Sequence, residues 1–262
     1  MNPEEQLRKI GLNPGKGQNF LNHRPTVEAL VAAGEVEGKR TLEIGGGLGA
    51  ITSVLGEETS DLTVVEKNGN MAVHLEKEFP GVEVVNGDIL EEDLSGFERC
   101  VSNIPFQLSS EIITKLGKAQ IQSALIVQDD LADKITADPG SKKHGFFTVK
   151  SQYYFLPVKL RKVDSRCFYP RPDVDTAIIK LYPNKERHNV DNEEGFFSFV
   201  KALHTHGKKK TRNAFVDARN MLGISKDEAK DLRGGLPHRS KRVRELGIAE
   251  LKECFEYFQK NT

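Results

Sequence analysis

The sequence lacks several features that define common protein classes. No apolar run approaches the ~20 residues that a membrane-spanning helix needs. The N-terminal Met-Asn-Pro-Glu-Glu-Gln contains no apolar core, so it does not resemble a secretory signal. No internal repeat, low-complexity tract or Ser-His-Asp arrangement is visible. These absences lead us to expect a cytoplasmic protein that does not act on membranes.

Cysteine is also scarce. Cys100, Cys167 and Cys254 lie far apart and lack the spacing of a metal site. We therefore expect reduced, structural cysteines and no bound metal. The 37% hydrophobic and 29% charged residues are those of a globular chain, and the length of 262 residues allows either one large domain or one ordinary domain plus a small one.

The formal net charge is zero, but the charges are unevenly distributed. Residues 199–244 carry 13 Lys or Arg against 4 Asp or Glu, a net charge of +9, so the rest of the chain carries −9. Basic side chains of this kind contact phosphates without reading sequence. The alternative is a solvated helix face. The predicted RNA-binding residues are Lys208, Lys209, Lys210, Arg212, Arg239, Lys241 and Arg242.

Two histidines, His204 and His206, lie in the same basic segment. We expect them to face RNA or solvent rather than to act in catalysis.

A glycine turn lies between a buried strand and a helix at residues 41–52, Thr-Leu-Glu-Ile-Gly-Gly-Gly-Leu-Gly-Ala-Ile-Thr. Gly45, Gly47 and Ala50 fit the dinucleotide-type pattern G-x-G-x-x-A. Glycine permits positive φ and a close approach of the backbone to a ligand, and the helix start offers free amides. The pattern predicts a nucleotide-type site, although a tight turn that binds nothing has the same sequence.

Polar residues end the next apolar runs. Glu66 ends the run from residue 62, Asp88 follows the run from residue 82, and Asn103 ends the run from residue 99. Open parallel sheets bind ligands at the carboxyl ends of their strands. We therefore expect these side chains to meet at one edge of a sheet, with strand-end capping as the alternative.

The periodicity predicts an α/β fold followed by a helical segment. Strands are expected near residues 41–45, 62–66, 82–85, 99–103 and 121–128, alternating with helices at 49–56, 68–78 and 109–117. Helices at 129–137 and 144–154 and strands at 155–163 and 175–182 follow. Beyond a polar linker the pattern is helical throughout. The predicted domains are residues 1–187 and 188–262.

Taken in order, the motifs resemble those of the S-adenosylmethionine-dependent adenine N6-methyltransferases. Within them the chain is similar to the small-subunit ribosomal RNA adenine dimethyltransferases, the KsgA family. Residues 17–21, Gly-Gln-Asn-Phe-Leu, and 168–175, Phe-Tyr-Pro-Arg-Pro-Asp-Val-Asp, extend the likeness to nearly the whole chain. The resemblance implies a Rossmann-like, seven-stranded class I methyltransferase sheet closed by an antiparallel hairpin, with a small all-helical C-terminal RNA-recognition domain.

The resemblance also implies the cofactor S-adenosylmethionine, with S-adenosylhomocysteine as its product. Glu66 would accept hydrogen bonds from both ribose hydroxyls and Asp88 from the adenine amino group. Glu43 would orient the turn or the ammonium group. The predicted cofactor-binding residues are Asn19, Leu21, Glu43, Gly45, Gly47, Glu66, Asp88 and Asn103.

The predicted catalytic residues are Asn103, Ile104, Pro105 and Phe106. An adenine amine is a poor nucleophile because its lone pair is delocalised into the ring. The Asn103 side-chain oxygen and the Ile104 carbonyl can each accept one amine hydrogen, and Phe106 offers a face for stacking. The family more often has Leu and Tyr at positions 104 and 106, but the backbone carbonyl and the aromatic face are retained.

The function predicted from these motifs is dimethylation of two adjacent adenosines in the 3′-terminal hairpin of small-subunit ribosomal RNA during ribosome biogenesis. The expected enzyme is monomeric and cytoplasmic, and acts within an immature subunit. An adenine methyltransferase for large-subunit ribosomal RNA and a largely non-catalytic assembly factor remain alternatives. A nicotinamide dehydrogenase would explain neither residues 103–106 nor the basic segment.

Overall fold

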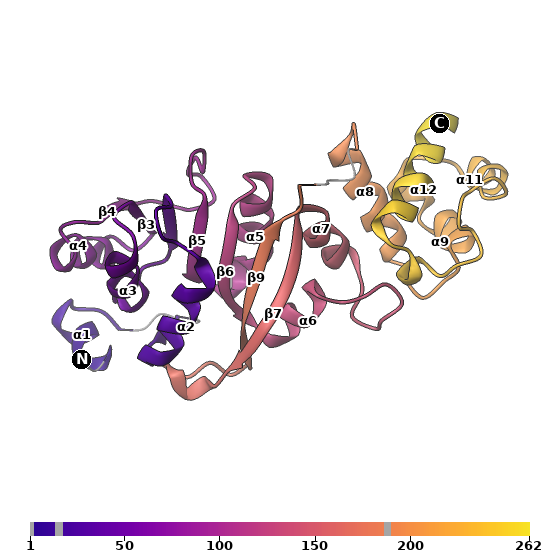
Figure 1. Ribbon diagram of the computed structural model, residues 1–262. Helices are drawn as coiled ribbons and strands as arrows, with labels where there is room; N and C mark the ends of the chain where they lie inside the picture. The colour runs from indigo at the N-terminus through magenta and orange to yellow at the C-terminus, as the bar shows by residue number, and fades with distance from the viewer. Residues whose placement is uncertain (1–2, 14–17, 186–189) are drawn as a thin grey trace. The chain divides into compact units, whose positions relative to one another are not determined.

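The computed structural model describes residues 3–13, 18–185 and 190–262, which form two compact units (Figure 1). The first unit is built from residues within 1–132 and 154–183, and the second from residues within 133–153 and 184–262. Gly17, part of the predicted N-terminal motif, lies outside the described residues.

The first unit contains every strand of the described chain. The strands are β1 (Phe20–Leu21), β2 (Thr41–Ile44), β3 (Leu62–Glu66), β4 (Glu83–Asn86), β5 (Arg99–Asn103), β6 (Gln122–Gln128), β7 (Phe155–Val163), β8 (Phe168–Tyr169) and β9 (Thr176–Pro183). The helices that lie wholly in this unit are α1 (Pro3–Lys9), α2 (Arg24–Gly34), α3 (Ala50–Glu58), α4 (Gly69–Glu78) and α5 (Ser109–Lys118).

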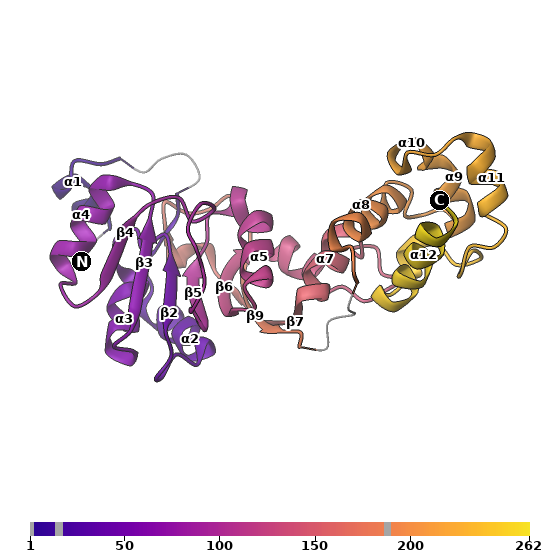
Figure 2. The same ribbon diagram turned by 90° about the horizontal axis from the view of Figure 1, so that it is seen from above.

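The seven-stranded sheet has the order β4-β3-β2-β5-β6-β9-β7, which can be followed from left to right in Figure 2. The five strands from β4 to β6 are parallel, and β9 is antiparallel to both of its neighbours, β6 and β7. This arrangement confirms the predicted fold class. The chain passes from β2 to β3 and β4 on one side and then returns to β5 on the other. The strand order therefore reverses between β2 and β5, where open sheets bind ligands.

One hydrophobic core holds three helices against this sheet. Leu30 of α2, Leu55 of α3 and Leu75 of α4 belong to one buried cluster with Val64 of β3 and Val101 of β5. All four residues of β2 are buried, as expected for a central strand covered on both faces. The glycine turn after β2 is thus carried by the most buried strand of the sheet's parallel half.

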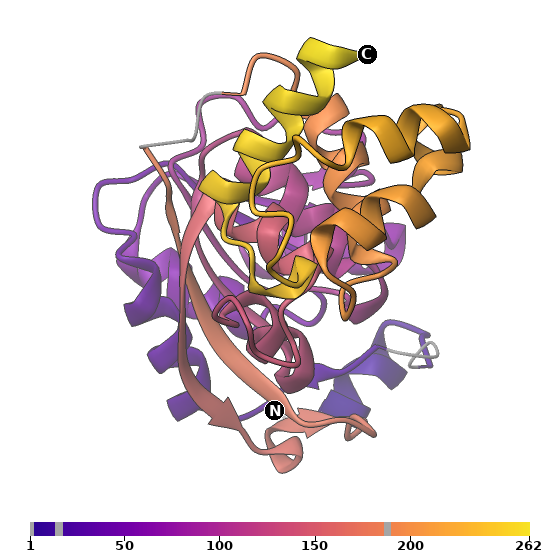
Figure 3. The ribbon, with the colours of Figure 1, turned by 90° about the vertical axis from the view of Figure 1, so that its right-hand side faces the viewer.

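The second unit is helical. Its helices are α7 (Phe146–Tyr154, ending in the first unit), α8 (Glu193–His204), α9 (Thr211–Asp217), α10 (Arg219–Leu222), α11 (Lys226–Leu232) and α12 (Ile248–Asn261), and α6 (Asp129–Ile135) crosses the boundary between the units. The helices α8 to α12 appear in orange and yellow in Figure 3. Their aromatic side chains form the core: Phe199 lies 5.6 Å from Phe255 between ring centroids.

The packing units depart from the predicted boundary after residue 187. Residues 133–153 pack with the C-terminal helices, because Tyr153 contacts Phe197 at 5.2 Å between ring centroids and Gly140 N donates to Arg244 O at 2.7 Å. Sequence order alone placed this segment in the first domain. The assignment of separate catalytic and RNA-recognition domains stays a prediction.

His204 is part of the interior, contrary to the expectation that it faces RNA or solvent. Its Nδ1 lies 2.9 Å from Val200 O, and its ring lies 5.9 Å from the ring of His144. Burial lowers the pKa of both rings, that of His144 to about 4. The apolar surroundings therefore favour the neutral form of both histidines.

Two further features were not predicted. The polar N-terminal segment forms α1, whose Leu7 is buried against Leu48 and Met71. The short strands β1 and β8 pair in antiparallel register, Phe20 with Tyr169 and Leu21 with Phe168. Two-residue strands have no periodicity that a sequence pattern could reveal.

Two helical glycines predict opposite effects of alanine. A Cβ added to Gly34 of α2 would lie 2.3 Å from Val101 Cγ2. A Cβ added to Gly56 of α3 would have Val82 Cγ2 as its nearest neighbour, at 4.0 Å. We expect Gly34→Ala to lower the free energy of unfolding by about 1–3 kcal/mol through overpacking. Gly56→Ala should raise it by about 0.5–1 kcal/mol through helix propensity.

Urea unfolding of both variants measures this difference. Equal stabilities of the two variants would contradict the packing described between α2 and β5.

Candidate active site

A cavity of about 270 Å³ lies at the carboxyl ends of β2, β3 and β5, beside the reversal of the strand order. All of the predicted cofactor-binding and catalytic residues line it. They are Asn19, Leu21, Glu43, Gly45, Gly47, Glu66, Asp88, Asn103, Ile104, Pro105 and Phe106. The parallel topology therefore brings together side chains that are up to 87 positions apart in the sequence, while their roles stay predictions.

The glycine turn requires glycine at three of its positions, Gly45, Gly47 and Gly49, the last with φ of +81°. Gly45 and Gly47 have φ of +73° and +56°, a region that side chains disfavour. A Cβ on Gly47 would also lie 3.1 Å from Phe20 Cδ1. The turn thus brings bare backbone to the cavity wall, and the ring of Phe20 packs across it.

Glu66 ties this turn to the end of β3. Its Oε2 accepts a hydrogen bond from Gly47 N at 3.0 Å, and its Oε1 accepts one from Asn68 N at 2.8 Å. The side chain is nearly buried. Each carboxylate oxygen can accept more than one hydrogen bond, so Glu66 retains acceptor capacity toward the cavity.

Asp88 already has partners on both oxygens. Lys67 Nζ forms an ion pair with Oδ2 at 2.7 Å, and Leu90 N donates to Oδ1 at 3.0 Å. The bonds from Lys67 and Leu90 lower the pKa of Asp88, so the carboxylate is ionised. Lys67 also lines the cavity, and sequence reasoning missed it. Its position directly after Glu66, the last residue of β3, is the sequence feature that could have indicated it.

Asn103 has one polar group bonded and the other unpartnered. Its Nδ2 donates to Asn19 O at 2.8 Å, while Oδ1 is buried and has no hydrogen-bond partner among the described residues. The turn that follows uses the carbonyl of Pro105, which accepts from Leu108 N at 3.0 Å. Hydrogen bonding in that turn therefore begins one residue beyond Ile104.

Glu43 is the most deeply buried ionisable group of the site. Its Oε2 accepts from Thr52 Oγ1 at 2.7 Å, and its Oε1 has no partner within the described part of the chain. Burial raises the pKa of Glu43 to about 8, and the charge of Glu66 contributes in the same direction. The carboxyl is therefore largely protonated at neutral pH.

In the second unit, backbone pairing joins the two basic runs. Lys210 and Arg242 form an antiparallel bridge, and Thr211 N donates to Lys241 O at 2.8 Å. Arg244 N donates to Gly207 O at 3.1 Å. We call residues 207–212 and 239–244 together the basic ribbon. The structure thus brings the predicted RNA-binding residues, which lie in two separate segments, onto one element.

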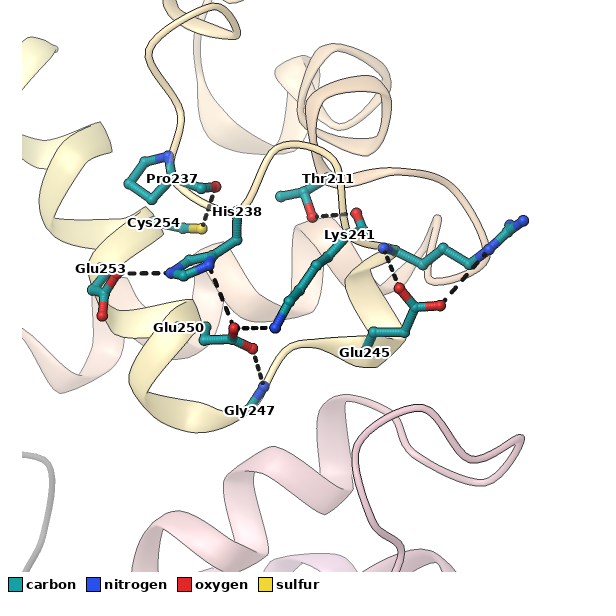
Figure 4. A network of polar contacts seen from close by, with 10 residues as sticks. Thr211, Pro237, His238, Lys241, Glu245, Gly247, Glu250, Glu253 and Cys254 are labelled. Carbon is teal, nitrogen blue, oxygen red and sulfur yellow. Dashed lines mark hydrogen bonds and ion pairs between the residues drawn. The ribbon is translucent and has the colours of Figure 1, made fainter.

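Carboxylates neutralise part of the basic ribbon. Lys241 forms an ion pair with Glu250, whose carboxylate also lies 3.4 Å from His238 Nδ1 (Figure 4). Lys209 forms a second ion pair, with Asp217 at 2.7 Å. Lys208, Lys210 and Arg212 are exposed and form no ion pair with the described residues. Arg239 is exposed as well, but its guanidinium donates to Gly234 O. Lys208, Lys210 and Arg212 are therefore the cations of the ribbon most available to a phosphate.

The described residues contain neither a cluster of side chains that could hold a metal ion nor a membrane-spanning helix. No group of three or more His, Cys, Asp or Glu side chains in this part of the chain could hold a metal ion. Among the helices described, none is both long enough and apolar enough to cross a membrane.

The burial of Glu43 predicts a dependence of stability on pH. Its pKa of about 8 in the folded chain lies above its ordinary value of 4.5. Its contribution is thus fully present below pH 4.5 and is lost as the pH rises toward 8. Relative to Glu43→Gln, which does not titrate, the wild type should lose up to about 1.4 kcal/mol of unfolding free energy per pH unit in this window.

Urea unfolding between pH 5 and 8 without ligand measures the effect, with the exposed Glu76→Gln on α4 as the matched control. Parallel stability curves for the wild type and Glu43→Gln would contradict it.

Comparison of the sequence with known families identifies one that spans most of the chain. The sequence model described as "Ribosomal RNA adenine dimethylase" matches residues 11–231. A protein of Thermococcus kodakarensis, named probable ribosomal RNA small subunit methyltransferase A, is 33% identical over 97% of this chain and 93% of its own length. A ribosomal RNA small subunit methyltransferase A of Prosthecochloris aestuarii is 34% identical over 84% of this chain and 87% of its own.

Solved structures share the fold. A dimethyladenosine transferase from Plasmodium falciparum matches with a TM-score of 0.82 and 21% identity, covering 92% of this chain and 98% of its own. The 23S rRNA methyltransferase ErmE matches with a TM-score of 0.68 and 24% identity over 92% of this chain and 99% of its own. The match of the family model over residues 11–231, with relatives above 30% identity along nearly the whole length, makes this chain a member of the ribosomal RNA adenine dimethylase family.

Proposed function

We propose that this protein dimethylates the N6 amines of two adjacent adenosines in the 3′-terminal hairpin of small-subunit ribosomal RNA. The observation that carries the proposal is the side chain of Asn103: the residue lines the cavity, and its buried Oδ1 has no partner among the described residues. A buried acceptor without a partner costs about 1–3 kcal/mol, so its retention needs a reason. Accepting a hydrogen from an amine in the cavity supplies one.

S-adenosylmethionine is the methyl donor, and it supplies a sulfonium-bound methyl group that needs no further activation. The residues present fit such a group. The backbone at Gly45 and Gly47 is open to the cavity, and Glu66 keeps acceptor capacity for hydroxyl groups. Glu43 lines the same cavity, and its Oε1 is also buried without a partner among the described residues. A cationic group such as an ammonium beside it would favour the ionised form of this carboxyl.

The remaining cofactor contacts are proposed from the resemblance to the family, for residues that line the cavity. Asn19 and Leu21 would cover the methionine end, and the ionised Asp88 would accept from the adenine amino group. Because Lys67 is paired with Asp88, it orients that carboxylate. S-adenosylhomocysteine is the product that these residues release.

The chain's own residues prepare the target amine. Asn103 Oδ1 accepts one amine hydrogen and the Ile104 carbonyl accepts the other, which Pro105 allows because it fixes the backbone. With both hydrogens held, electron density shifts toward the nitrogen lone pair. Orientation of the reacting groups supplies up to ~7–11 kcal/mol of barrier reduction in favourable cases. Phe106, half-buried at the cavity, offers a ring on which the extruded base stacks.

The basic ribbon holds the RNA. Lys208, Lys210 and Arg212 contact phosphates, and these contacts position the substrate without reading its sequence. Relatives named as small subunit methyltransferases support the small-subunit substrate. We infer further that the enzyme acts as a cytoplasmic monomer on RNA within an immature subunit.

The catalytic loop predicts different defects for its two side chains. Asn103→Ala should reduce the methylation rate strongly while RNA binding stays nearly intact, because its bond to the amine strengthens in the transition state. Phe106→Ala should lower the population of extruded base as well as turnover, whereas Phe106→Tyr keeps the ring and stays active.

Single-turnover methylation at saturating RNA and cofactor, with a fluorescent adenine analogue at the target, measures both effects. The exposed Asn70→Ala on α4 serves as the control. A wild-type rate for Asn103→Ala would show that the proposed chemistry is wrong.

The ion pairs of the basic ribbon predict which cations contribute to RNA affinity. Replacing Lys208, Lys210 and Arg212 together with alanine should weaken binding to RNA of any sequence. The slope of log affinity against log salt should flatten by ~0.7–0.9 for each phosphate that the variant no longer neutralises. The charge-matched control replaces Lys226, Lys230 and Arg233 on and after α11.

Filter binding or anisotropy over a range of salt concentrations, after circular dichroism confirms folding, gives the slopes. Equal slopes for the two triple variants would place the RNA contacts elsewhere.

A further inference from the structure

The amide of Asn103 is held in one orientation by the main chain of an N-terminal segment. Asn103 Nδ2 donates to Asn19 O at 2.8 Å. A carbonyl oxygen can only accept, so this contact requires the NH₂ group of the amide on that side. The same bond therefore directs Oδ1 away from Asn19 O. This oxygen is buried without a partner among the described residues, and Asn103 lines the cavity.

The Asn19 carbonyl is itself fixed by its neighbours. Directly after it, β1 pairs with β8, and Asn22 N donates to Cys167 O at 2.8 Å. Leu21 and Phe168 belong to the buried core of the first unit. We call residues 18–22 the strap. The strap is anchored on both its pairing and its apolar side, and the bond from Asn103 adds to this anchoring.

We propose that the Asn19 carbonyl is a positioning group for catalysis, which selects the side-chain oxygen of Asn103 as the atom that faces the target amine. The inference rests on the proposed function of Asn103. Without this bond the amide could rotate by half a turn and present its NH₂ group, a donor, to a second donor. The strap then serves the reaction as well as covering the cofactor end of the cavity.

The two roles of Asn103 make different demands on a substitute. Accepting an amine hydrogen requires only an oxygen, which an aspartate carboxylate also supplies. Donating to Asn19 O requires a hydrogen, which an ionised carboxylate lacks. A protonated aspartic acid meets both demands, because its hydroxyl donates while its other oxygen accepts. Asn103→Asp is therefore the variant that separates acceptance from positioning.

The first measurement uses hydrogen–deuterium exchange without cofactor or RNA. Removing the bond in Asn103→Ala should speed exchange of the amides of Phe20, Leu21 and Asn22 by about fivefold, the equivalent of one net hydrogen bond of ~1 kcal/mol. The control Asn70→Ala should leave these amides unchanged. Unchanged exchange in Asn103→Ala overturns the proposal, because the strap and the side chain would then be uncoupled.

The second measurement is the pH profile of single-turnover methylation from pH 5.5 to 8.5. The rate of Asn103→Asp relative to wild type should rise as the pH falls, by about tenfold per unit above the pKa of the new carboxyl group. A ratio that stays constant with pH, at any level, overturns the positioning role. Dividing by the wild-type rate removes effects of pH on RNA and on the fold.

The outcome for the proposed function is read separately. If Asn103→Ala methylates at the wild-type rate, the proposed chemistry fails. If Asn103→Ala is inactive while the Asn103→Asp ratio is constant, the chemistry stands and only the role of the Asn19 carbonyl is refuted.

Discussion

The hydrogen bond from Gly47 N to the Glu66 carboxylate is the constraint on which the cavity depends. Because β2 and β3 are parallel and in register, the turn after Ile44 and the strand end at Glu66 meet at one edge. The same carboxylate accepts from Asn68 N, immediately before α4. One side chain thus fixes the glycine turn, the strand end and the entry to a helix.

Two buried oxygens of this edge, Glu43 Oε1 and Asn103 Oδ1, have no partner among the described residues. Nearby groups show that the fold can satisfy polar atoms: Ser102 Oγ donates to Ile44 O and Thr52 Oγ1 to Glu43 Oε2. Leaving these two oxygens without partners lowers stability by an amount that packing elsewhere offsets. Under the proposed function both atoms acquire donors only when ligands are bound, so binding removes this penalty.

Much of this site could be predicted from the sequence, for a physical reason. Buried parallel strands read as continuous apolar runs, and Glu66 and Asn103 stand where such runs end. The topology then brings them together whatever lies between. The pairing of β1 with β8 could not be predicted, because two residues have no period and their register depends on tertiary packing. The helix of α1 was missed for a similar reason, since Leu7 is its only buried residue.

The ion pairs of the second unit, unlike its cations, could not be predicted from the sequence. The cations can be counted in the sequence, but their partners cannot be read there, because folding brings them close: Glu250 comes from α12 and Asp217 from α9. Exposed ion pairs contribute only about 0–1 kcal/mol, so a phosphate can compete for a paired lysine. The pairs therefore lower the affinity that each cation contributes without removing it. Lys208, Lys210 and Arg212, which have no ion pair among the described residues, avoid that competition. The backbone bridge between Lys210 and Arg242 keeps both groups of cations on one element.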